Sequence, residues 1–237
     1  MSVFRFKQFS IQQDHCAMKI GTDGVLLGAW ATINHNPFSI LDIGSGTGVI
    51  ALMLAQRSTS EIVDALEIDT EAYEQCVENF EQSPWNDRLF CYHASLQEFT
   101  EEIDDKYDLI VSNPPFYSED YKSDNIKRDL ARFEDALPFN HLLESVSKLL
   151  SEMGKFTVII PYREEKKIIE LASNHNLYVN EILHVKGNLN SKIKRSLIEF
   201  SFNKRDISIK NLIIETKRHK YTQDYFNLTK DFYLNMS

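Results

Sequence analysis

Four consecutive residues, Asn113-Pro114-Pro115-Phe116, could hold an amino group that is attached to an aromatic ring. They follow an apolar stretch, 107–111, that is typical of a β-strand. The two prolines fix φ and lack backbone N–H groups, so the carbonyls of this loop stay free to accept hydrogen bonds. The amide oxygen of Asn113 adds another acceptor, and the ring of Phe116 offers a flat face for stacking. Taken alone, however, the motif favours an ordinary proline turn at the end of a strand.

A glycine-rich turn, LDIGSGTG at 41–48, indicates a nucleotide-like cofactor. Gly44, Gly46 and Gly48 stand where a strand turns into a helix, and glycine lets the backbone approach a ligand closely. Val49 occupies the position where the dinucleotide fingerprint GxGxxG requires its third glycine, which weakens an NAD-dependent oxidoreductase as the interpretation.

A carboxylate beside this turn, Asp42, separates the cofactor classes further. It would repel a pyrophosphate and attract an ammonium group, by about 1 kcal/mol in water and about 4 kcal/mol at 4 Å in a partly screened cleft. S-adenosylmethionine carries an ammonium group and no phosphate. The turn therefore predicts S-adenosylmethionine as the cofactor.

Polar residues after the next two strand-like stretches complete the predicted cofactor site. Glu67 stands where an acidic side chain accepts hydrogen bonds from ribose hydroxyls in dinucleotide sites. Asp69 is the nearby competitor, although a negative charge before the helical stretch from Thr70 is explained equally by the helix dipole. Ser95 follows the third strand, where it could contact the adenine of the cofactor.

The elements that position these residues alternate between strands and helices. Strands are expected at 39–43, 62–68, 89–92, 107–111 and 155–160, and helices at 46–56, 70–80 and 139–150. This alternation predicts an α/β fold with a mostly parallel, doubly wound sheet covered on both faces. A helix at 163–174 and two longer strands at 178–186 and 194–202 then predict an antiparallel hairpin at the sheet edge.

Length and composition set the class of protein. The 237 residues, 43% of them hydrophobic, suit one domain over 1–237, with an N-terminal prelude at 1–37 and a basic, aromatic C-terminal extension at 204–237. The three cysteines are widely spaced and lack a CxxC pair, so neither a disulfide framework nor a metal site is expected. The chain has no long apolar segment, so the expected localisation is cytoplasmic and no membrane partner is expected.

The charge distribution leaves room for a nucleic-acid partner. The formal net charge of −9 argues against one at first sight, because phosphate binding draws on clustered lysine and arginine. The stretch 186–220, however, has ten basic and three acidic residues, a local net charge of +7. This local positive charge is explained equally well by a basic binding face on an acidic protein and by an ordinary solvated surface.

Together, the segments LDIGSGTG, ALEID and VSNPPF resemble the class I S-adenosylmethionine-dependent methyltransferases, and in particular the N6-adenine group with its Asn-Pro-Pro-aromatic motif. Four further segments are similar to the bacterial tRNA(Val) adenine-N6 methyltransferase family, and the resemblance covers almost the whole chain. These segments are FKQFSIQQDHCAMKIGTDGVLLGAW, SPW, KRSLIEF and LTKDFYL.

The resemblance implies a seven-stranded Rossmann-like sheet and methylation of N6 of adenine 37, in the anticodon loop of tRNA1(Val). It implies a catalytic loop at Asn113, Pro114, Pro115 and Phe116, and cofactor contacts from Lys19, Thr22, Asp23, Asp42, Gly44, Gly46, Gly48, Glu67 and Asn113. Ser95 departs from the aspartate that is common in relatives, which leaves the adenine contact open.

Contacts with the RNA substrate are expected from two regions. Phe116 and its neighbour Tyr117 could stack on an extruded base. The basic side chains of Arg128, Arg132, Lys194 and Arg195 could contact RNA, although solvated surface explains them equally well.

Rival functions remain open. An enzyme of the same class could methylate an amino group of ribosomal RNA guanine, DNA adenine or a protein glutamine. A module that keeps the fold but only binds RNA is a rival from another class. Intact Asp42, Glu67 and Asn113 favour the enzyme, and no obligate protein partner is expected.

Overall fold

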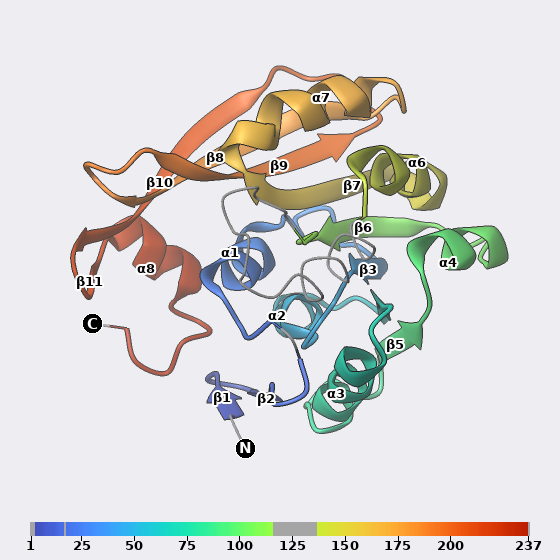
Figure 1. The fold of residues 1–237 in the computed structure, drawn as a ribbon, viewed down its shortest axis with the longest axis horizontal. Coiled ribbons are helices and arrows are strands. Elements are labelled where there is room, and N and C mark those ends of the chain that lie inside the picture. Colours follow the sequence, from blue (N-terminus) through green and yellow to red (C-terminus); the bar gives the residue numbers. More distant parts are fainter. Residues whose placement is uncertain (1–2, 17, 116–136, 237) are drawn as a thin grey trace, which may run out of the picture.

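The computed structural model describes residues 3–16, 18–115 and 137–236, and one twisted sheet runs through this part of the chain (Figure 1). In spatial order its strands are β11 (Lys220–Tyr221), β10 (Ser208–Lys217), β8 (Tyr178–Asn188), β9 (Ile193–Ser201), β7 (Leu150–Pro161), β6 (Tyr107–Ser112), β3 (Ser39–Ile43), β4 (Ile62–Glu67) and β5 (Leu89–His93). The strands β3 to β7 are mutually parallel where they pair, whereas β9 is antiparallel to both β7 and β8.

The seven strands from β5 to β8 match the predicted Rossmann-like sheet with its antiparallel hairpin. The extension at the C-terminus adds two more strands, because β10 pairs in parallel with β8 and β11 pairs with β10. The hairpin of β8 and β9 therefore does not end the sheet, in contrast to the prediction from the sequence. Instead, β10 covers the backbone N–H and C=O groups that an edge strand would leave unpaired.

Helices cover both faces of the sheet, as Figure 1 shows. On one face lie α1 (Thr22–Trp30), α2 (Val49–Arg57), α3 (Thr70–Glu81) and α8 (Gln223–Thr229), and on the other α4 (Leu96–Glu102), α6 (Phe139–Leu149) and α7 (Glu165–Ser173). Each face has its own hydrophobic cluster. Among the described residues, no helix is long and apolar enough to cross a membrane.

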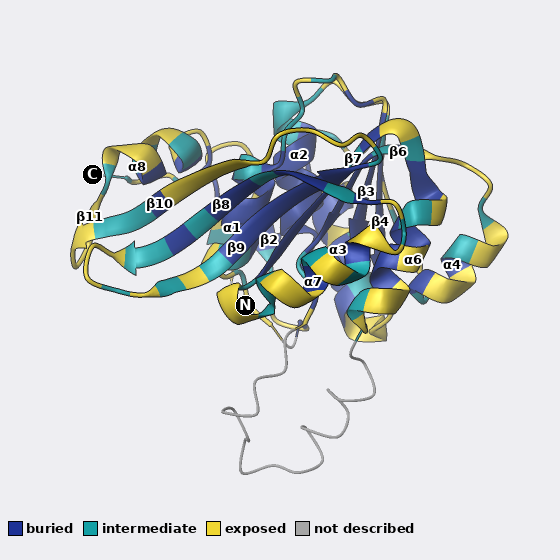
Figure 2. Cartoon of the chain, turned by 90° about the horizontal axis from the view of Figure 1, so that it is seen from above, coloured by how far each residue is buried: buried dark blue, intermediate teal, exposed yellow. Residues whose placement is uncertain are grey.

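The central strands are largely apolar because both of their faces are buried. In β6, for example, Leu109 and Val111 join one cluster, whereas Ile110 between them joins the other. Figure 2 shows this burial along β3, β4 and β6, in contrast to the more exposed β10 and β11. The sequence predicted these strands because such short, mainly apolar runs are typical of a parallel sheet.

The N-terminal segment forms a small ribbon of β1 (Val3–Arg5) and β2 (Ser10–Gln12), which α3 holds in place. The buried amide of Asn79 accepts a hydrogen bond from the Gln12 N–H at 2.8 Å and donates to the carbonyls of Gln12 and Thr47, each at 2.9 Å. One turn earlier, Gln75 Oε1 accepts hydrogen bonds from the backbone N–H groups of 14–15. Because Thr47 belongs to the glycine turn, these amides fix the N-terminal segment beside that turn.

Candidate active site

The carboxyl ends of β3, β4 and β6 meet at one edge of the sheet. In the strand register, Ile43 lies opposite Leu66 on one side and Ser112 on the other. The buried hydroxyl of Ser112 donates a hydrogen bond of 3.0 Å to the Ile43 carbonyl, which fixes the end of β6 against the end of β3. The glycine turn, Glu67 and Asn113 therefore leave the sheet side by side, at the edge where open α/β sheets bind ligands.

The backbone of the glycine turn is open to a ligand at two of its glycines. Gly44, Gly46 and Gly48 have φ values of 74°, 53° and 78°, in the left-handed region that favours glycine. A Cβ atom added at Gly44 or Gly46 would meet no heavy atom within 4 Å. Both positions thus leave room for a cofactor to approach the main chain.

Gly48 is required for packing instead. A Cβ atom there would lie 2.5 Å from Cε1 of Phe80 and 2.9 Å from Sγ of Cys76, both on α3. The third glycine of the turn therefore lets α2 begin directly against α3.

Substitution of Gly48 by alanine should lower the free energy of unfolding by about 2–5 kcal/mol, from left-handed strain of about 1–2 kcal/mol and overpacking of about 1–3 kcal/mol. Gly46→Ala is the matched control, because it adds the same strain without the steric clash. Urea denaturation of both variants measures the difference. Equal losses of stability in the two variants would show that the side chains of Phe80 and Cys76 move aside without a loss of folding free energy.

Glu67 holds the turn against the end of β4. Its Oε2 accepts a hydrogen bond from the Gly46 N–H at 2.7 Å, and its Oε1 accepts from the N–H groups of Ile68 and Asp69 at 2.9 and 3.0 Å. The carboxylate is half-buried, and its remaining lone pairs can still accept from ribose hydroxyls. Asp69 caps α3 by accepting from the Ala72 N–H at 2.8 Å, which agrees with the helix-terminal explanation of this residue.

Asp42 lies behind the turn and is fully buried. Its Oδ2 accepts a hydrogen bond of 3.2 Å from the Ala51 N–H in the first turn of α2, and its Oδ1 has no partner among the described residues. Burial raises the pKa of this carboxyl from 3.8 to about 7, and the negative charge of Glu67 adds to the shift. Any attraction that Asp42 exerts on an ammonium group must therefore act across the turn, without direct contact.

Ser95 serves the start of α4. Its hydroxyl accepts from the Glu98 N–H at 3.2 Å and donates to Glu98 Oε2 at 2.7 Å, while Oε2 also accepts from the Ser95 N–H. This is a complete capping box. The only proton of the hydroxyl is used within the helix terminus, so the structure gives Ser95 a structural role and offers no hydroxyl donor to an adenine ring.

The predicted residues of the N-terminal motif lie at the start of α1. Lys19 and Thr22 are exposed, and the helix is capped by Gly21. Asp23 forms an ion pair with Arg195 of β9, with 2.8 Å between Oδ2 and Nε. The structure thereby joins a residue predicted for the cofactor to one predicted for RNA, although 172 positions separate them. Lys194, next to Arg195, is exposed.

The predicted catalytic loop begins directly at the end of β6. Asn113 is half-buried, Pro114 is buried and Pro115 is exposed. Within the described part of the chain the Asn113 amide makes no hydrogen bond, so it is available to a ligand at this edge. Phe116, Tyr117, Arg128 and Arg132, which were also predicted for the site, lie outside the described residues.

One residue near the site carried no recognisable signal in the sequence. Cys16 is buried, and burial together with the charges of Glu67 and Asp69 raises the pKa of its thiol to about 12. The bonds of Asn79 to Gln12 and Thr47 place the N-terminal segment beside the glycine turn. Gln75 and Asn79, which hold that segment, were also missed, although two amides four positions apart on the buried side of a helix are a readable pattern.

Solved structures share this architecture. A structure described as a predicted O-methyltransferase from Agrobacterium tumefaciens matches with a TM-score of 0.67 and 18% identity, covering 89% of this chain and 96% of its own. A ribosomal protein L11 methylase from Lactobacillus delbrueckii subsp. bulgaricus matches with a TM-score of 0.53 and 19% identity, over 75% of this chain and 76% of its own. At these identities the likeness shows the fold.

The fold and the sheet-edge site define a Rossmann-like methyltransferase, and the model of the methyltransferase small domain family matches residues 24–160. Proteins called tRNA1(Val) (adenine(37)-N6)-methyltransferase are 62% identical in Flavobacterium psychrophilum, over 99% of this chain and 100% of the relative, and 44% identical in Bacteroides fragilis, over 98% of both. The chain belongs to the tRNA1(Val) (adenine(37)-N6)-methyltransferase family. The resemblance inferred from the sequence motifs is thus confirmed.

Proposed function

We propose that the protein transfers a methyl group from S-adenosylmethionine to N6 of adenine 37 in tRNA1(Val), in the cytoplasm. The observation that carries this proposal is the register that places Asn113 beside the glycine turn and Glu67. The names of relatives 62% identical over nearly the full length support the choice of substrate.

The test is incubation with labelled S-adenosylmethionine and total tRNA from cells that lack the protein, followed by nucleoside mapping. We expect label in N6-methyladenosine at position 37 of tRNA1(Val) and in no other nucleoside. Label in methylguanosine, or in DNA or protein substrates alone, would overturn the assignment.

The groups at the sheet edge fit this cofactor. The open main chain at Gly44 and Gly46 can lie against it, and Glu67 can accept hydrogen bonds from its ribose hydroxyls. Glu67 on the turn, Asp42 at the end of β3 and Asp69 at the start of α3 are carboxylates, which suit hydroxyl and ammonium donors and repel a pyrophosphate. Lys19, Thr22 and Asp23, at the start of α1, are proposed to border its methionine end.

When bound, S-adenosylmethionine supplies a methyl group activated by a sulfonium centre. The contribution of the chain is to orient the amine, whose lone pair is delocalised into the adenine ring. The Asn113 side-chain oxygen and the Pro114 carbonyl can accept the two amine hydrogens, which draws the nitrogen out of the ring plane and frees its lone pair. The same acceptor dipoles stabilise positive charge on the nitrogen as it attacks, so no strong base is needed.

Basic side chains lie at the same end of the sheet and can hold RNA phosphates. Because β7 and β8 are both antiparallel to β9, β8 runs in the same direction as the central parallel strands, and β10 is parallel to β8. The turns that follow β8 and β10 therefore project from the edge where the glycine turn lies. Lys192 and Arg218 lie in these turns, and Lys194, Lys217 and Lys220 lie at the strand ends beside them.

Tight binding of tRNA should weaken steeply with salt, and Lys194→Ala should reduce the slope of log affinity against log salt by about 0.7–0.9 for each phosphate that this side chain neutralises. Lys148→Ala is the matched control, because Lys148 is exposed at the end of α6, next to the amino end of β7 at the opposite edge of the sheet. Fluorescence anisotropy across a salt series gives both slopes. A salt response that is flat, or identical in the two variants, would show that Lys194 does not bind phosphate.

A further inference from the structure

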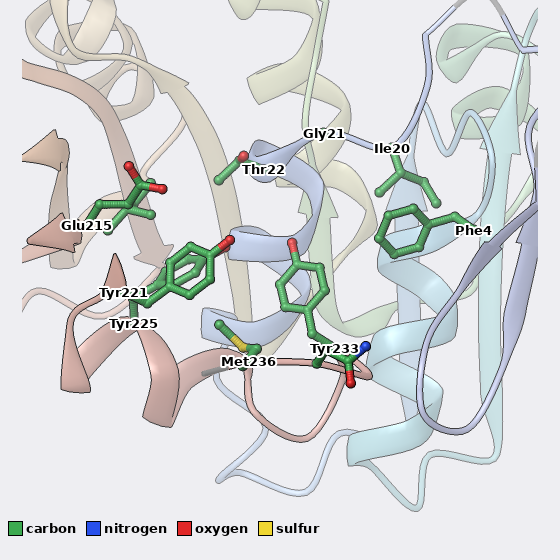
Figure 3. Close-up of a pocket in the computed structure, with 11 residues that line it drawn as sticks. Phe4, Ile20, Gly21, Thr22, Glu215, Tyr221, Tyr225, Tyr233 and Met236 are labelled. Carbon is green, nitrogen blue, oxygen red and sulfur yellow. The ribbon is translucent and has the colours of Figure 1, made fainter. Parts of the chain in front are cut away.

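A cavity of about 350 Å³ lies beside the start of α1 (Figure 3). Its walls come from both ends of the chain: the N-terminal ribbon and the start of α1 on one side, and the β10–β11 hairpin, α8 and the C-terminal tail on the other. The residues that matter here are Phe4, Thr22, Glu215, Tyr221, Tyr225 and Tyr233. The glycine turn, Glu67 and Asn113 do not line it.

The walls are largely aromatic. The rings of Tyr221 and Tyr225 lie 5.2 Å apart between centroids, and those of Phe4 and Tyr233 lie 6.3 Å apart. Tyr225 is only 3% exposed. Tyr221, by contrast, is 37% exposed at the rim. A rigid floor and an accessible ring together suit a flat ligand that stacks.

The polar groups that line the cavity can accept hydrogen bonds. Glu215 is half-buried, and its Oε1 accepts from the His219 N–H at 3.2 Å in the turn that leads to β11. A carboxylate has lone pairs to spare, so it can also accept from an amino group or a ring N–H. The hydroxyls of Thr22 and Tyr233 border the same space, and Figure 3 shows the Tyr233 phenol pointing toward α1.

The charge around the cavity decides between a cation and a nucleotide. Tyrosines with one carboxylate could hold an ammonium ion. However, Lys217, Arg218 and Lys220 are exposed on the hairpin that supplies Glu215 and Tyr221. Three positive charges outweigh one carboxylate, so they disfavour a free cation and favour a base that is joined to phosphates.

The cavity is also placed to work together with the methylation site. Thr22, the first residue of α1, lines the cavity. The next residue, Asp23, forms the ion pair with Arg195 near the start of β9. We propose that the cavity binds a second base of the RNA substrate, one other than the adenine that is methylated. This inference rests on the proposed function, because it assumes an RNA substrate at the same edge of the sheet.

Tyr221→Ala tests the stacking contact. With tRNA1(Val) transcript we expect its Kd and KM to rise by about 5- to 150-fold, while kcat and the affinity for S-adenosylmethionine stay unchanged. Tyr221→Phe keeps the ring and should bind like the wild type. Tyr178→Ala is the matched control, because Tyr178 is a partly exposed tyrosine at the opposite end of β8, where Lys204 lies 4.5 Å from its ring centroid.

Ultraviolet crosslinking of the wild-type chain to tRNA, with mapping of the linked peptides, provides a readout that does not depend on any variant folding. Crosslinks at Tyr221, Tyr225 or Tyr233 would support the proposal. A Tyr221→Ala variant with the wild-type Kd, or crosslinks confined to other segments, would overturn it. Failure of the wild type to methylate tRNA would instead refute the proposed function, which separates the two outcomes.

Discussion

Replacement of Asn113 by alanine should lower kcat for methyl transfer by about 100- to 1000-fold, the loss expected when one preorganised polar contact to a transition state is removed. The position of Asn113 at the end of β6, fixed by the hydrogen bond from Ser112 to Ile43, should survive the substitution. Its amide has no hydrogen bond to the described part of the chain, so alanine leaves the hydrogen bonds of that part intact. Binding of S-adenosylmethionine through the glycine turn and Glu67 should therefore persist.

Two measurements separate these effects. Single-turnover methylation of tRNA1(Val) transcript reports the chemical step, and calorimetric titration reports the affinity for S-adenosylmethionine. Asn211→Ala, at an exposed position on β10, is the control for removal of an asparagine side chain and should leave both unchanged. Wild-type turnover by Asn113→Ala would mean that another group orients the amine. Loss of S-adenosylmethionine binding would instead mean that Asn113 binds the cofactor and does not orient the amine.

The fold could be predicted from the sequence because its central strands are buried on both faces. Such strands are mainly apolar runs between helical patterns, so the alternation of the two predicted that β3 to β7 are parallel. The outer strand β10 is different. Most of its residues are exposed or half-buried, so its sequence carried a weak signal, and its parallel pairing with β8 depends on a partner far earlier in the chain.

The positions of two candidate site residues could also be predicted, because they follow from the parallel order of the strands. Parallel topology brings residues that follow successive strands to one edge, so Glu67 and Asn113 could be placed beside the glycine turn from their positions alone. The pairing of Asp23 with Arg195 could not, because long-range ion pairs leave no local pattern. Ser95 is a different case, since the Ser-x-x-Glu spacing of a capping box was readable and explains the residue without a cofactor.

Substitution of Asp42 by asparagine should stabilise the folded chain by up to about 4 kcal/mol above pH 7, which is the free-energy equivalent of a pKa raised from 3.8 to about 7. The sign follows from proton binding. Between pH 4 and 7 the folded chain keeps the Asp42 proton that the unfolded chain has released, so stability falls as the pH rises through this window. Asparagine removes this decrease, and its side-chain oxygen can still accept from the Ala51 N–H.

Urea denaturation at pH 4, 5, 6, 7 and 8 measures the gap between the variant and the wild type, which should open across the window and reach a plateau above pH 7. Asp64→Asn is the matched control, because burial raises the Asp64 pKa to about 6 while its carboxylate accepts a hydrogen bond from Tyr107, so its gap should level off one pH unit earlier. A gap for Asp42→Asn that is independent of pH would contradict a buried, titrating carboxyl.

If the charge of Asp42 acts across the turn on an ammonium group, the same substitution should weaken S-adenosylmethionine binding, whereas Asp64→Asn should not. Asp42 would then be a residue that lowers the stability of the chain at neutral pH and strengthens its hold on the cofactor.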